Sequence, residues 1–223
     1  MEKIDCIIMA GGKASRFDFN QIDQAIKEKP LIQVKKTRLI DVIIKVALNS
    51  ESLAKIYIAT SPHTPKTYQY LKSQNNPKIE ILSTPGKDFH SDLKFIIETY
   101  NLSNVLILTA DLPTIHPSFL NSIVQKFFEE KKPALAVMMD WERAIKNSTI
   151  PTDRNNAFID KYGNKLFSIG INILNGKLIR ESFIDQIEYI TENVDLLLNI
   201  NTADDYYRYV SFLDEKKKVD DYP

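Results

Sequence analysis

Short apolar runs alternate along the chain with segments whose apolar residues recur every three to four positions. The runs predict strands at residues 4–10, 55–60, 78–83, 105–109 and 134–139, with further strands within 167–174 and 188–201. The periodic segments predict helices at residues 39–48, 66–73, 92–100, 117–128 and 203–214. This alternation generates βαβ units, so we expect an α/β fold with a mainly parallel sheet. The first strand is apolar on both faces and should be central.

Two of these helices and one polar segment add detail to the pattern. The apolar side chains of residues 117–128 fall on one stripe, which indicates packing against the core and not a cofactor site. Residues 39–48 are apolar almost all round, so this helix lies either in the core or against a second copy of the chain in a homodimer. Residues 140–162 are polar and irregular, and we expect a long loop there.

Length and composition set the outer limits. The 223 residues suit a single domain, expected over residues 1–215, followed by a polar tail at 216–223. The 29 basic and 29 acidic residues cancel, so no overall charge draws the chain to nucleic acid. The start of the chain lacks the features of a secretory signal, and no apolar run is long enough to span a membrane. We therefore expect a cytoplasmic protein whose single cysteine, Cys6, is reduced and buried.

The first apolar run ends in a glycine loop with cationic side chains. Residues 7–17 read IIMAGGKASRF, so Gly11 and Gly12 are followed closely by Lys13 and Arg16. In an open α/β sheet, ligands bind beyond the carboxyl ends of the strands, and a turn without β-carbons lets backbone N–H groups approach a phosphate. The Walker loop and the dinucleotide fingerprint need further glycines, whose absence excludes a dinucleotide-dependent epimerase or dehydrogenase. A pair of glycines also fits a plain tight turn, so the loop alone does not decide.

Asp111 follows the fourth predicted strand, in the sequence ILTADLP. A carboxylate at this place either caps the next helix or holds a divalent metal against phosphate oxygens. The glycine loop at the same sheet edge favours the metal, because phosphoryl chemistry needs positive donors and a metal that neutralises charge. Lys29, in the sequence EKPL, supplies a second cationic position. His63, His90 and His116 show no metal-ligand spacing, and we assign them no catalytic role.

The segments AGGKASR, EKPL and ADLP resemble the signature of the nucleotidyltransferases of the molybdenum-cofactor guanylyltransferase type. Within that family, the likeness is nearest to the archaeal enzymes that use adenosylcobinamide phosphate. It extends to IATSPHTPKT at 58–67, which is the most specific segment, to PGK and DL within 85–93, PALAVMM at 133–139, GIN at 170–172 and NINTADD at 199–205. The segments cover nearly the whole chain in the family's order.

The resemblance implies a Rossmann-like three-layer α/β/α sandwich with a mostly parallel, mixed sheet. It also implies a guanylyltransferase that uses Mg²⁺ and moves GMP from GTP to adenosylcobinamide phosphate, giving adenosylcobinamide-GDP and pyrophosphate. The partners are then small molecules, GTP and a corrinoid phosphate. Because the acceptor phosphate is already anionic at neutral pH, no general base is required. The choice of guanine over other bases comes from the resemblance alone.

The same resemblance assigns roles to particular residues. We expect Arg16 and Lys29 to meet the β- and γ-phosphates, since a guanidinium can grip two oxygens at once, and Asp111 to hold Mg²⁺. Asn199 is a second candidate ligand of the metal. Nucleotide-binding positions are expected in the glycine loop and in two later loops: Ala10, Gly11, Gly12, Lys13, Ser15, Thr60, Ser61, Lys87 and Asp92. For Lys87, a solvated turn lysine is the competing interpretation.

The chain departs from the family's pattern at two places. The family loop often continues Gly-Thr-Arg-Met-Gly, whereas this chain has Ala14 after Lys13, so that position must tolerate a β-carbon. Residues 18–28 form a longer link between Arg16 and Lys29 than expected. They make either a helical lid over the triphosphate or an ordering segment at an interface, and the position of Lys29 stays open.

Two alternative functions also stay open. A sibling transferase acting on molybdopterin, phospholactate or a sugar phosphate would keep the same loop residues, because those bind only the nucleotide. The other alternative is a noncatalytic protein that binds a nucleotide or a corrinoid. The joint presence of Arg16, Lys29 and Asp111 argues against it, because a carrier needs neither a metal ligand nor a clamp on a leaving group.

Overall fold

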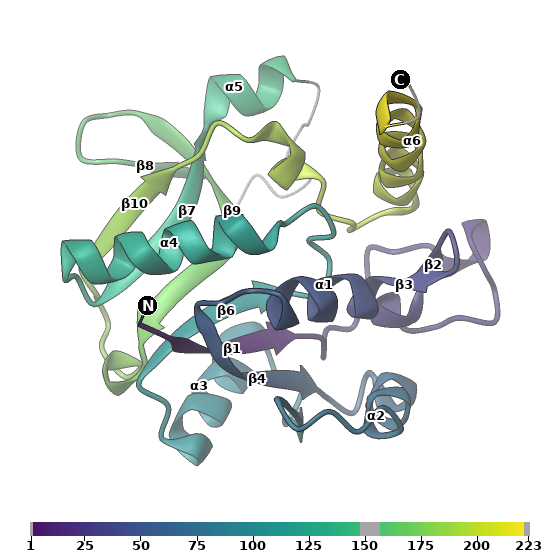
Figure 1. Ribbon diagram of the computed structural model, residues 1–223, viewed down its shortest axis with the longest axis horizontal. Coiled ribbons are helices and arrows are strands. Elements are labelled where there is room, and N and C mark those ends of the chain that lie inside the picture. The colour runs from purple at the N-terminus through teal and green to yellow at the C-terminus, as the bar shows by residue number, and fades with distance from the viewer. Residues whose placement is uncertain (1, 148–156, 221–223) are drawn as a thin grey trace.

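The computed structural model describes residues 2–147 and 157–220. Eight strands in this part of the chain form one sheet with the order β10-β7-β9-β6-β1-β4-β5, and β8 pairs with β9 outside that row (Figure 1). Strand β9 runs antiparallel to β6 and β7, while the other neighbours in the row are parallel, which confirms the mostly parallel, mixed sheet. The strands are β1 (Ile4–Met9), β4 (Leu53–Thr60), β5 (Ile79–Ser83), β6 (Asn104–Thr109), β7 (Ala134–Asp140), β8 (Ala157–Ile159), β9 (Lys165–Asn175) and β10 (Gln186–Ile190).

Helices cover both faces of the sheet. Successive side chains of a strand point to opposite faces, so Cys6 and Ile8 of β1 pack with α1 and α4, whereas Ile7 packs with α3. The result is the expected three-layer α/β/α sandwich (Figure 1). The helices are α1 (Leu39–Leu48), α2 (Pro65–Lys72), α3 (Phe89–Tyr100), α4 (Pro117–Glu130), α5 (Trp141–Lys146) and α6 (Ala203–Asp220).

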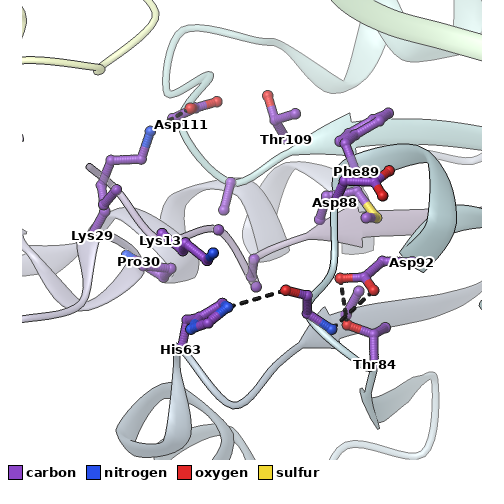
Figure 2. A pocket seen from close by; sticks show the side chains of 18 of the residues that line it. Lys13, Lys29, Pro30, His63, Thr84, Asp88, Phe89, Asp92, Thr109 and Asp111 are labelled. Carbon is purple, nitrogen blue, oxygen red and sulfur yellow. Dashed lines mark hydrogen bonds and ion pairs between the residues drawn. The ribbon is translucent and has the colours of Figure 1, made fainter. Parts of the chain in front are cut away.

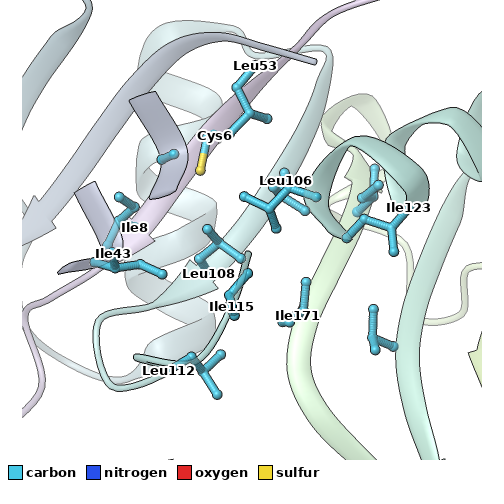
Figure 3. Packing of buried hydrophobic residues seen from close by; sticks show 14 of the residues in the cluster. Cys6, Ile8, Ile43, Leu53, Leu106, Leu108, Leu112, Ile115, Ile123 and Ile171 are labelled. Carbon is cyan, nitrogen blue, oxygen red and sulfur yellow. The ribbon is translucent and has the colours of Figure 1, made fainter. Parts of the chain in front are cut away.

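The larger apolar cluster accounts for the two most apolar helices. The stripe of α4 is buried, as its periodicity predicts, and Ile123 points into the cluster (Figure 3). Helix α1 is also core, because it buries Leu39, Ile40, Ile43, Ile44 and Ala47 within a single chain. Its apolar surface is therefore explained without a second copy of the protein.

A smaller cluster joins the segment after the glycine loop to α6. Its buried members are Phe17, Ile32, Val34, Leu39, Ile200 and Tyr209. Residues 18–28 contain only a 3-10 turn at Phe19–Gln21, so the lid helix that we considered does not form. Instead, Ile22 and Ile26 pack against this cluster, and Tyr207 of α6 donates a hydrogen bond of 2.7 Å to the Gln21 carbonyl. The long link is an ordered segment docked on the C-terminal helix.

Other differences from the predicted elements are local. Residues 140–162 were expected to be a loop, but they contain α5, which the Asp140 side chain caps, and β8; residues 148–156 lie outside the described part. Strand β10 ends at Ile190, and a 3-10 turn at Val194–Leu197 replaces the rest of the strand expected there. The hairpin of β2 (Gln33–Val34) and β3 (Thr37–Arg38) was not predicted.

At its C-terminal end, the chain is more regular than expected. Helix α6 continues to Asp220, through most of the segment expected as a tail, and residues 221–223 lie outside the description. Lysine and glutamate are good helix formers, so a polar sequence can extend a helix without an apolar stripe to reveal it. None of the helices within residues 2–147 and 157–220 has the length and apolar character needed to cross a membrane.

Candidate active site

A cavity of about 390 Å³ lies at the carboxyl ends of β1 and β6. The two strands are parallel neighbours, so their ends meet at one edge of the sheet. One wall is the glycine loop, the opposite wall is the segment 84–88 with the start of α3, and a third side is formed by Lys29, Pro30 and Asp111 (Figure 2). Asn201, which is bonded to Lys29, also lines the cavity. Residues that are far apart in the chain therefore converge at one cavity.

The cavity brings together most of the residues singled out in the sequence. Its lining includes Ala10, Gly11, Gly12, Lys13, Ser15, Arg16, Lys29, Lys87, Asp92 and Asp111. Thr60, Ser61 and Asn199 are not part of the lining. His63 also lines the cavity, and it belongs to the SPHTP loop of the segment 58–67, which the resemblance places beside the base. Other lining residues were not singled out in the sequence; among them are Thr84, Asp88, Phe89, Thr109 and Asn201.

Lys29 and Asp111 form the central polar contact of the site. Lys29 Nζ lies 2.5 Å from Asp111 Oδ2, and the two side chains are only 17% and 13% exposed. The second oxygen, Asp111 Oδ1, is buried and accepts no hydrogen bond from the described residues. A buried carboxylate oxygen without a partner is costly, so this site would be stabilised by a ligand that donates or coordinates there.

This unsatisfied oxygen fits a Mg²⁺ ion. Magnesium prefers oxygen ligands, and in enzymes that bind phosphorylated substrates it is held by one or two carboxylates together with the substrate phosphates. Among the described residues, no group of three or more histidine, cysteine, aspartate or glutamate side chains could hold a metal alone. An ion held by Asp111 would take its other ligands from water or from substrate phosphates.

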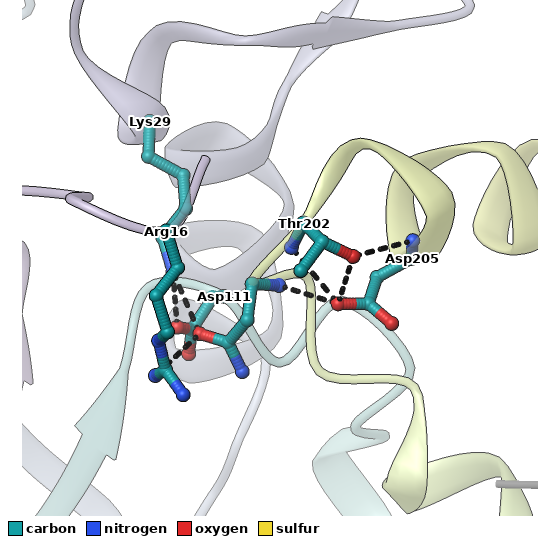
Figure 4. Close-up of polar contacts among 6 residues, drawn as sticks. Arg16, Lys29, Asp111, Thr202 and Asp205 are labelled. Atoms are coloured by element: carbon teal, nitrogen blue, oxygen red, sulfur yellow. Dashed lines mark hydrogen bonds and ion pairs between the residues drawn. The ribbon is translucent and has the colours of Figure 1, made fainter. Parts of the chain in front are cut away.

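Asn201 links the cationic side chains, although it was not among the residues expected in the site. Its Oδ1 accepts hydrogen bonds from Lys29 Nζ at 3.3 Å and Arg16 Nη2 at 3.4 Å (Figure 4). Asp205 holds the backbone on which Asn201 sits, because its Oδ2 accepts from the N–H groups of Asn201 and Thr202 at 3.0 and 2.9 Å. Thr202 Oγ1 in turn accepts from the Asp205 N–H, which is the capping-box pattern at a helix start. The spacing of Thr202 and Asp205 was the available signal for this turn.

Asn199 occupies a different environment from Asn201. Between them, Ile200 donates its N–H to the Asp111 carbonyl at 3.0 Å, so the turn is docked directly on the end of β6. Asn199 Oδ1 is buried without a hydrogen-bond partner among the described residues, but its side chain does not line the cavity. Of the two asparagines, only Asn201 therefore reaches the cavity with its side chain.

The glycine loop presents backbone N–H groups as possible hydrogen-bond donors to a ligand. The N–H of Ala10 already donates to the Ala59 carbonyl at 2.8 Å, so it cannot serve a phosphate as we expected. The N–H groups of Gly11, Gly12 and Lys13 have no acceptor in the described residues. Ala14, where the family often has glycine, has a φ of +51°, so it adopts the left-handed conformation that favours glycine.

Thr60 and Ser61 lie behind the glycine loop. Ser61 Oγ donates to the Gly11 carbonyl at 2.6 Å, and Thr60 Oγ1 donates to the Leu82 carbonyl at 2.7 Å. A β-carbon built on Gly11 would lie 3.0 Å from Ser61 Cβ, closer than such contacts normally allow. These two residues shape the cavity from behind instead of lining it.

The opposite wall is ordered by Asp92. This buried carboxylate accepts from Thr84 Oγ1 at 2.8 Å and from the Gly86 N–H at 3.0 Å (Figure 2). His63 reaches across from the neighbouring loop, with its Nε2 at 3.1 Å from the Gly86 carbonyl. Lys87 is exposed on the rim of this wall. Asp92 therefore has both oxygens engaged in holding the wall.

Comparison with known proteins points to one group of enzymes. Residues 6–195 match the MobA-like NTP transferase domain. The chain is 34% identical over 209 residues to an adenosylcobinamide-phosphate guanylyltransferase of Methanocaldococcus jannaschii, which covers 91% of this chain and 93% of that protein. It is 30% identical over 124 residues to a probable molybdenum cofactor guanylyltransferase of Thermococcus sibiricus, about 55% of each chain.

Solved structures with much lower identity share the fold. CMP:2-keto-3-deoxy-manno-octonic acid synthetase complexed with CTP superposes with a TM-score of 0.70 at 13% identity, covering 96% of this chain and 100% of the other. A nucleotidyl transferase from Methanothermobacter thermautotrophicus gives a TM-score of 0.64 at 13% identity, covering 97% and 100%. The fold is thus one that nucleotidyltransferases use.

Proposed function

Because the chain belongs to the MobA-like NTP transferase domain family, we propose that it is a guanylyltransferase that moves GMP from GTP to adenosylcobinamide phosphate. The observation that carries this proposal is the 34% identity, over 91% of the chain, to a relative that bears this activity in its name. The products are adenosylcobinamide-GDP and pyrophosphate.

The reaction exchanges one phosphoanhydride bond for another. An oxygen of the acceptor phosphate forms a bond to the α-phosphorus of GTP, and the bond between that phosphorus and the oxygen bridging to the β-phosphorus breaks. Pyrophosphate leaves with the bridging oxygen and its negative charge. The acceptor phosphate is an anion at neutral pH, so the protein needs to position the groups and stabilise charge but not to remove a proton.

The cations of the cavity suit the leaving group. Arg16 and Lys29 share the Asn201 oxygen as a hydrogen-bond acceptor, so their charges are held close together. Charge that develops on the departing pyrophosphate is stabilised best by donors fixed in advance in a site with little water. The N–H groups of Gly11, Gly12 and Lys13 add uncharged donors for the triphosphate.

The carboxylate of Asp111 would hold Mg²⁺. Mg²⁺, when bound, would neutralise charge on the phosphate oxygens and help to hold them in line for displacement. The unsatisfied Asp111 Oδ1 supports this assignment. Asn199 stays our proposed second ligand because its buried Oδ1 also lacks a partner, although its side chain lies outside the cavity lining. Lys29 fixes the orientation of the carboxylate through its contact with Oδ2.

For the nucleoside, we propose the side of the cavity formed by residues 84–88 and the start of α3. Asp92 would act by holding this wall, and Thr60 and Ser61 by supporting the glycine loop from behind. Lys87 on the rim and Ser15 in the loop are proposed to contact the nucleotide directly, since both line the cavity.

A screen for pyrophosphate release tests the proposal. Each of the four ribonucleoside triphosphates is combined with Mg²⁺ and with cobinamide phosphate, molybdopterin, phospholactate or a sugar phosphate. We expect release only with GTP and cobinamide phosphate. Release with molybdopterin would support a function nearer to the Thermococcus relative, while GTP binding without release for any acceptor would support a noncatalytic nucleotide-binding protein. Parallel reactions with Asp111→Asn protein correct for a contaminating transferase.

A further inference from the structure

Glu28, the residue before Lys29, is buried although it is ionisable. Its exposed fraction is 5%, and both of its carboxylate oxygens accept hydrogen bonds. Oε1 accepts from the Lys66 N–H at 2.8 Å, and Oε2 accepts from the Thr67 N–H at 2.7 Å and from Thr67 Oγ1 at 2.6 Å. These donors belong to the first turn of α2, 38 positions further along the chain. Glu28 therefore caps a helix to which it is not adjacent in sequence.

The residue that would normally cap this helix is engaged elsewhere. Thr64 precedes α2, but its side chain makes no capping bond to the helix and instead accepts from the Ser61 N–H at 3.1 Å. The first N–H groups of a helix need an acceptor and lie at the positive end of the helix dipole. A carboxylate at this place satisfies both needs, which explains why the Glu28 side chain can be buried.

The segment 61–67, whose last two residues bond Glu28, also contacts two walls of the cavity. Ser61 Oγ bonds the Gly11 carbonyl of the glycine loop, and His63 bonds the Gly86 carbonyl of the opposite wall. The segment 61–67 thus contacts the glycine loop and the wall at residues 84–88. It also contacts Glu28, which directly precedes Lys29. It is the common support of the site.

Lys29 has little freedom of its own once Glu28 is fixed. It begins a 3-10 turn, Lys29–Leu31, in which Pro30 is buried, and proline restricts both its own backbone and that of the residue before it. With the backbone held at both sides, the side chain spans from this turn to Asp111 Oδ2. An anchor at Glu28 therefore sets where the ammonium group lies.

We propose that Glu28 is a positioning residue, which holds Lys29 against the triphosphate by tying its backbone to the start of α2. The proposal rests on the proposed function, because it assigns Lys29 to the phosphates of GTP. The alternative is that Glu28 only caps α2 and stabilises the fold. The two differ in whether an effect of Glu28 on GTP binding requires the Lys29 side chain.

A double-mutant cycle on GTP binding separates them. The dissociation constant for GTP with Mg²⁺ is measured by calorimetry for the full chain and for Glu28→Gln, Lys29→Met and the double variant. Glutamine has one acceptor oxygen, so one of the two helix N–H groups loses its partner. We expect Glu28→Gln to weaken binding about tenfold when Lys29 is present and less than about twofold when residue 29 is methionine. An equal loss in both backgrounds would overturn the proposal.

Two further variants keep the result interpretable. Asp140→Ala removes the side chain that caps α5, outside the cavity lining, and should lower thermal stability without changing GTP affinity. Thr67→Val removes one of the three bonds to Glu28 and should give a smaller, Lys29-dependent loss of affinity if Glu28→Gln does not fold. If the unmodified chain binds GTP but does not transfer GMP, the proposed reaction fails while the cycle still reports on Glu28. If it binds no GTP, the nucleotide assignment itself fails.

Discussion

Lys29 and Asp111 are 82 positions apart in the chain, yet Lys29 Nζ lies 2.5 Å from Asp111 Oδ2. The lysine comes from the segment after the glycine loop, and the aspartate from the end of β6. Because the pair is mostly buried, removing either partner would leave a charge without compensation. Asp111 Oδ1 accepts no hydrogen bond from the described residues. This oxygen is therefore available to a ligand of the site.

Asp111→Asn should abolish Mg²⁺-dependent turnover while the protein stays folded. The amide keeps the shape of the side chain and can still accept from Lys29, but it loses the negative charge that favours a cation. Initial rates across a Mg²⁺ titration, together with thermal unfolding of the same preparation, measure both effects. A folded variant with full activity would mean that Asp111 holds no metal.

Arg16→Ala should lower turnover about 10²- to 10³-fold, by analogy with the loss of a single fixed donor to a developing oxyanion. The loss should fall mainly on kcat, because the leaving charge grows in the transition state. Arg180→Ala is the matched control, since Arg180 pairs with Glu98 on an exposed surface outside the cavity lining. Near-normal turnover of the Arg16 variant would remove this residue from the mechanism.

Asn201→Ala and Asn199→Ala should have different consequences. Asn201 accepts from both Lys29 and Arg16, so its loss should weaken GTP binding and turnover about tenfold or more by releasing two side chains at once. Asn199 contacts neither, and its loss should instead raise the Mg²⁺ concentration needed for half-maximal rate. Rates measured against both GTP and Mg²⁺ distinguish these outcomes. If Asn199→Ala leaves the Mg²⁺ dependence unchanged, Asn199 is not a metal ligand.

The fold was largely predictable because the apolar residues of its long helices recur every three to four positions and those of its long strands form continuous runs. The stripe of α4 and the doubly apolar β1 are set by burial in a sheet with two covered faces, and burial leaves a clear pattern. The β2–β3 hairpin has two residues in each strand, and α5 has six residues, which is too short for a period to show. Those elements depend on a local cap or on docking against α6, and neither leaves a periodic pattern.

The site was predictable where a residue directly follows a strand. Gly11 and Asp111 were visible for that reason, because the ends of neighbouring parallel strands must meet. Asn201 was not visible, since an amide gains its role only from the cations that contact it. The place of Lys29 was equally hidden, because it depends on contacts of Glu28 with residues 38 and 39 positions away.

Cys6 should resist alkylation in the native protein at neutral pH. Its side chain is fully buried in β1, and this burial, reinforced by the nearby negative charge of Asp5, raises the thiol pKa well above its ordinary value. The reactive thiolate is therefore scarce, and the reagent has no access to it. Labelling followed by mass spectrometry, with and without denaturant, measures this. Prompt labelling of native protein would contradict the buried position of β1.

Gly11→Ala and Gly12→Ala test whether phosphates pass close to the glycine loop. A β-carbon at Gly11 would lie 3.0 Å from Ser61 Cβ and 3.1 Å from the Thr60 carbonyl carbon, so the loop must shift. We expect Gly11→Ala to lower the free energy of unfolding by about 1–3 kcal/mol and to weaken GTP binding as well.

At Gly12, nothing lies within 4 Å of the added carbon, so stability should change by less than about 0.5 kcal/mol. Gly12 nevertheless lines the cavity, and its β-carbon would take space that a phosphate needs, so GTP binding should still fall. Denaturant unfolding and calorimetry on both variants separate the two effects, and unchanged GTP affinity of Gly12→Ala would show that the phosphates do not approach this backbone.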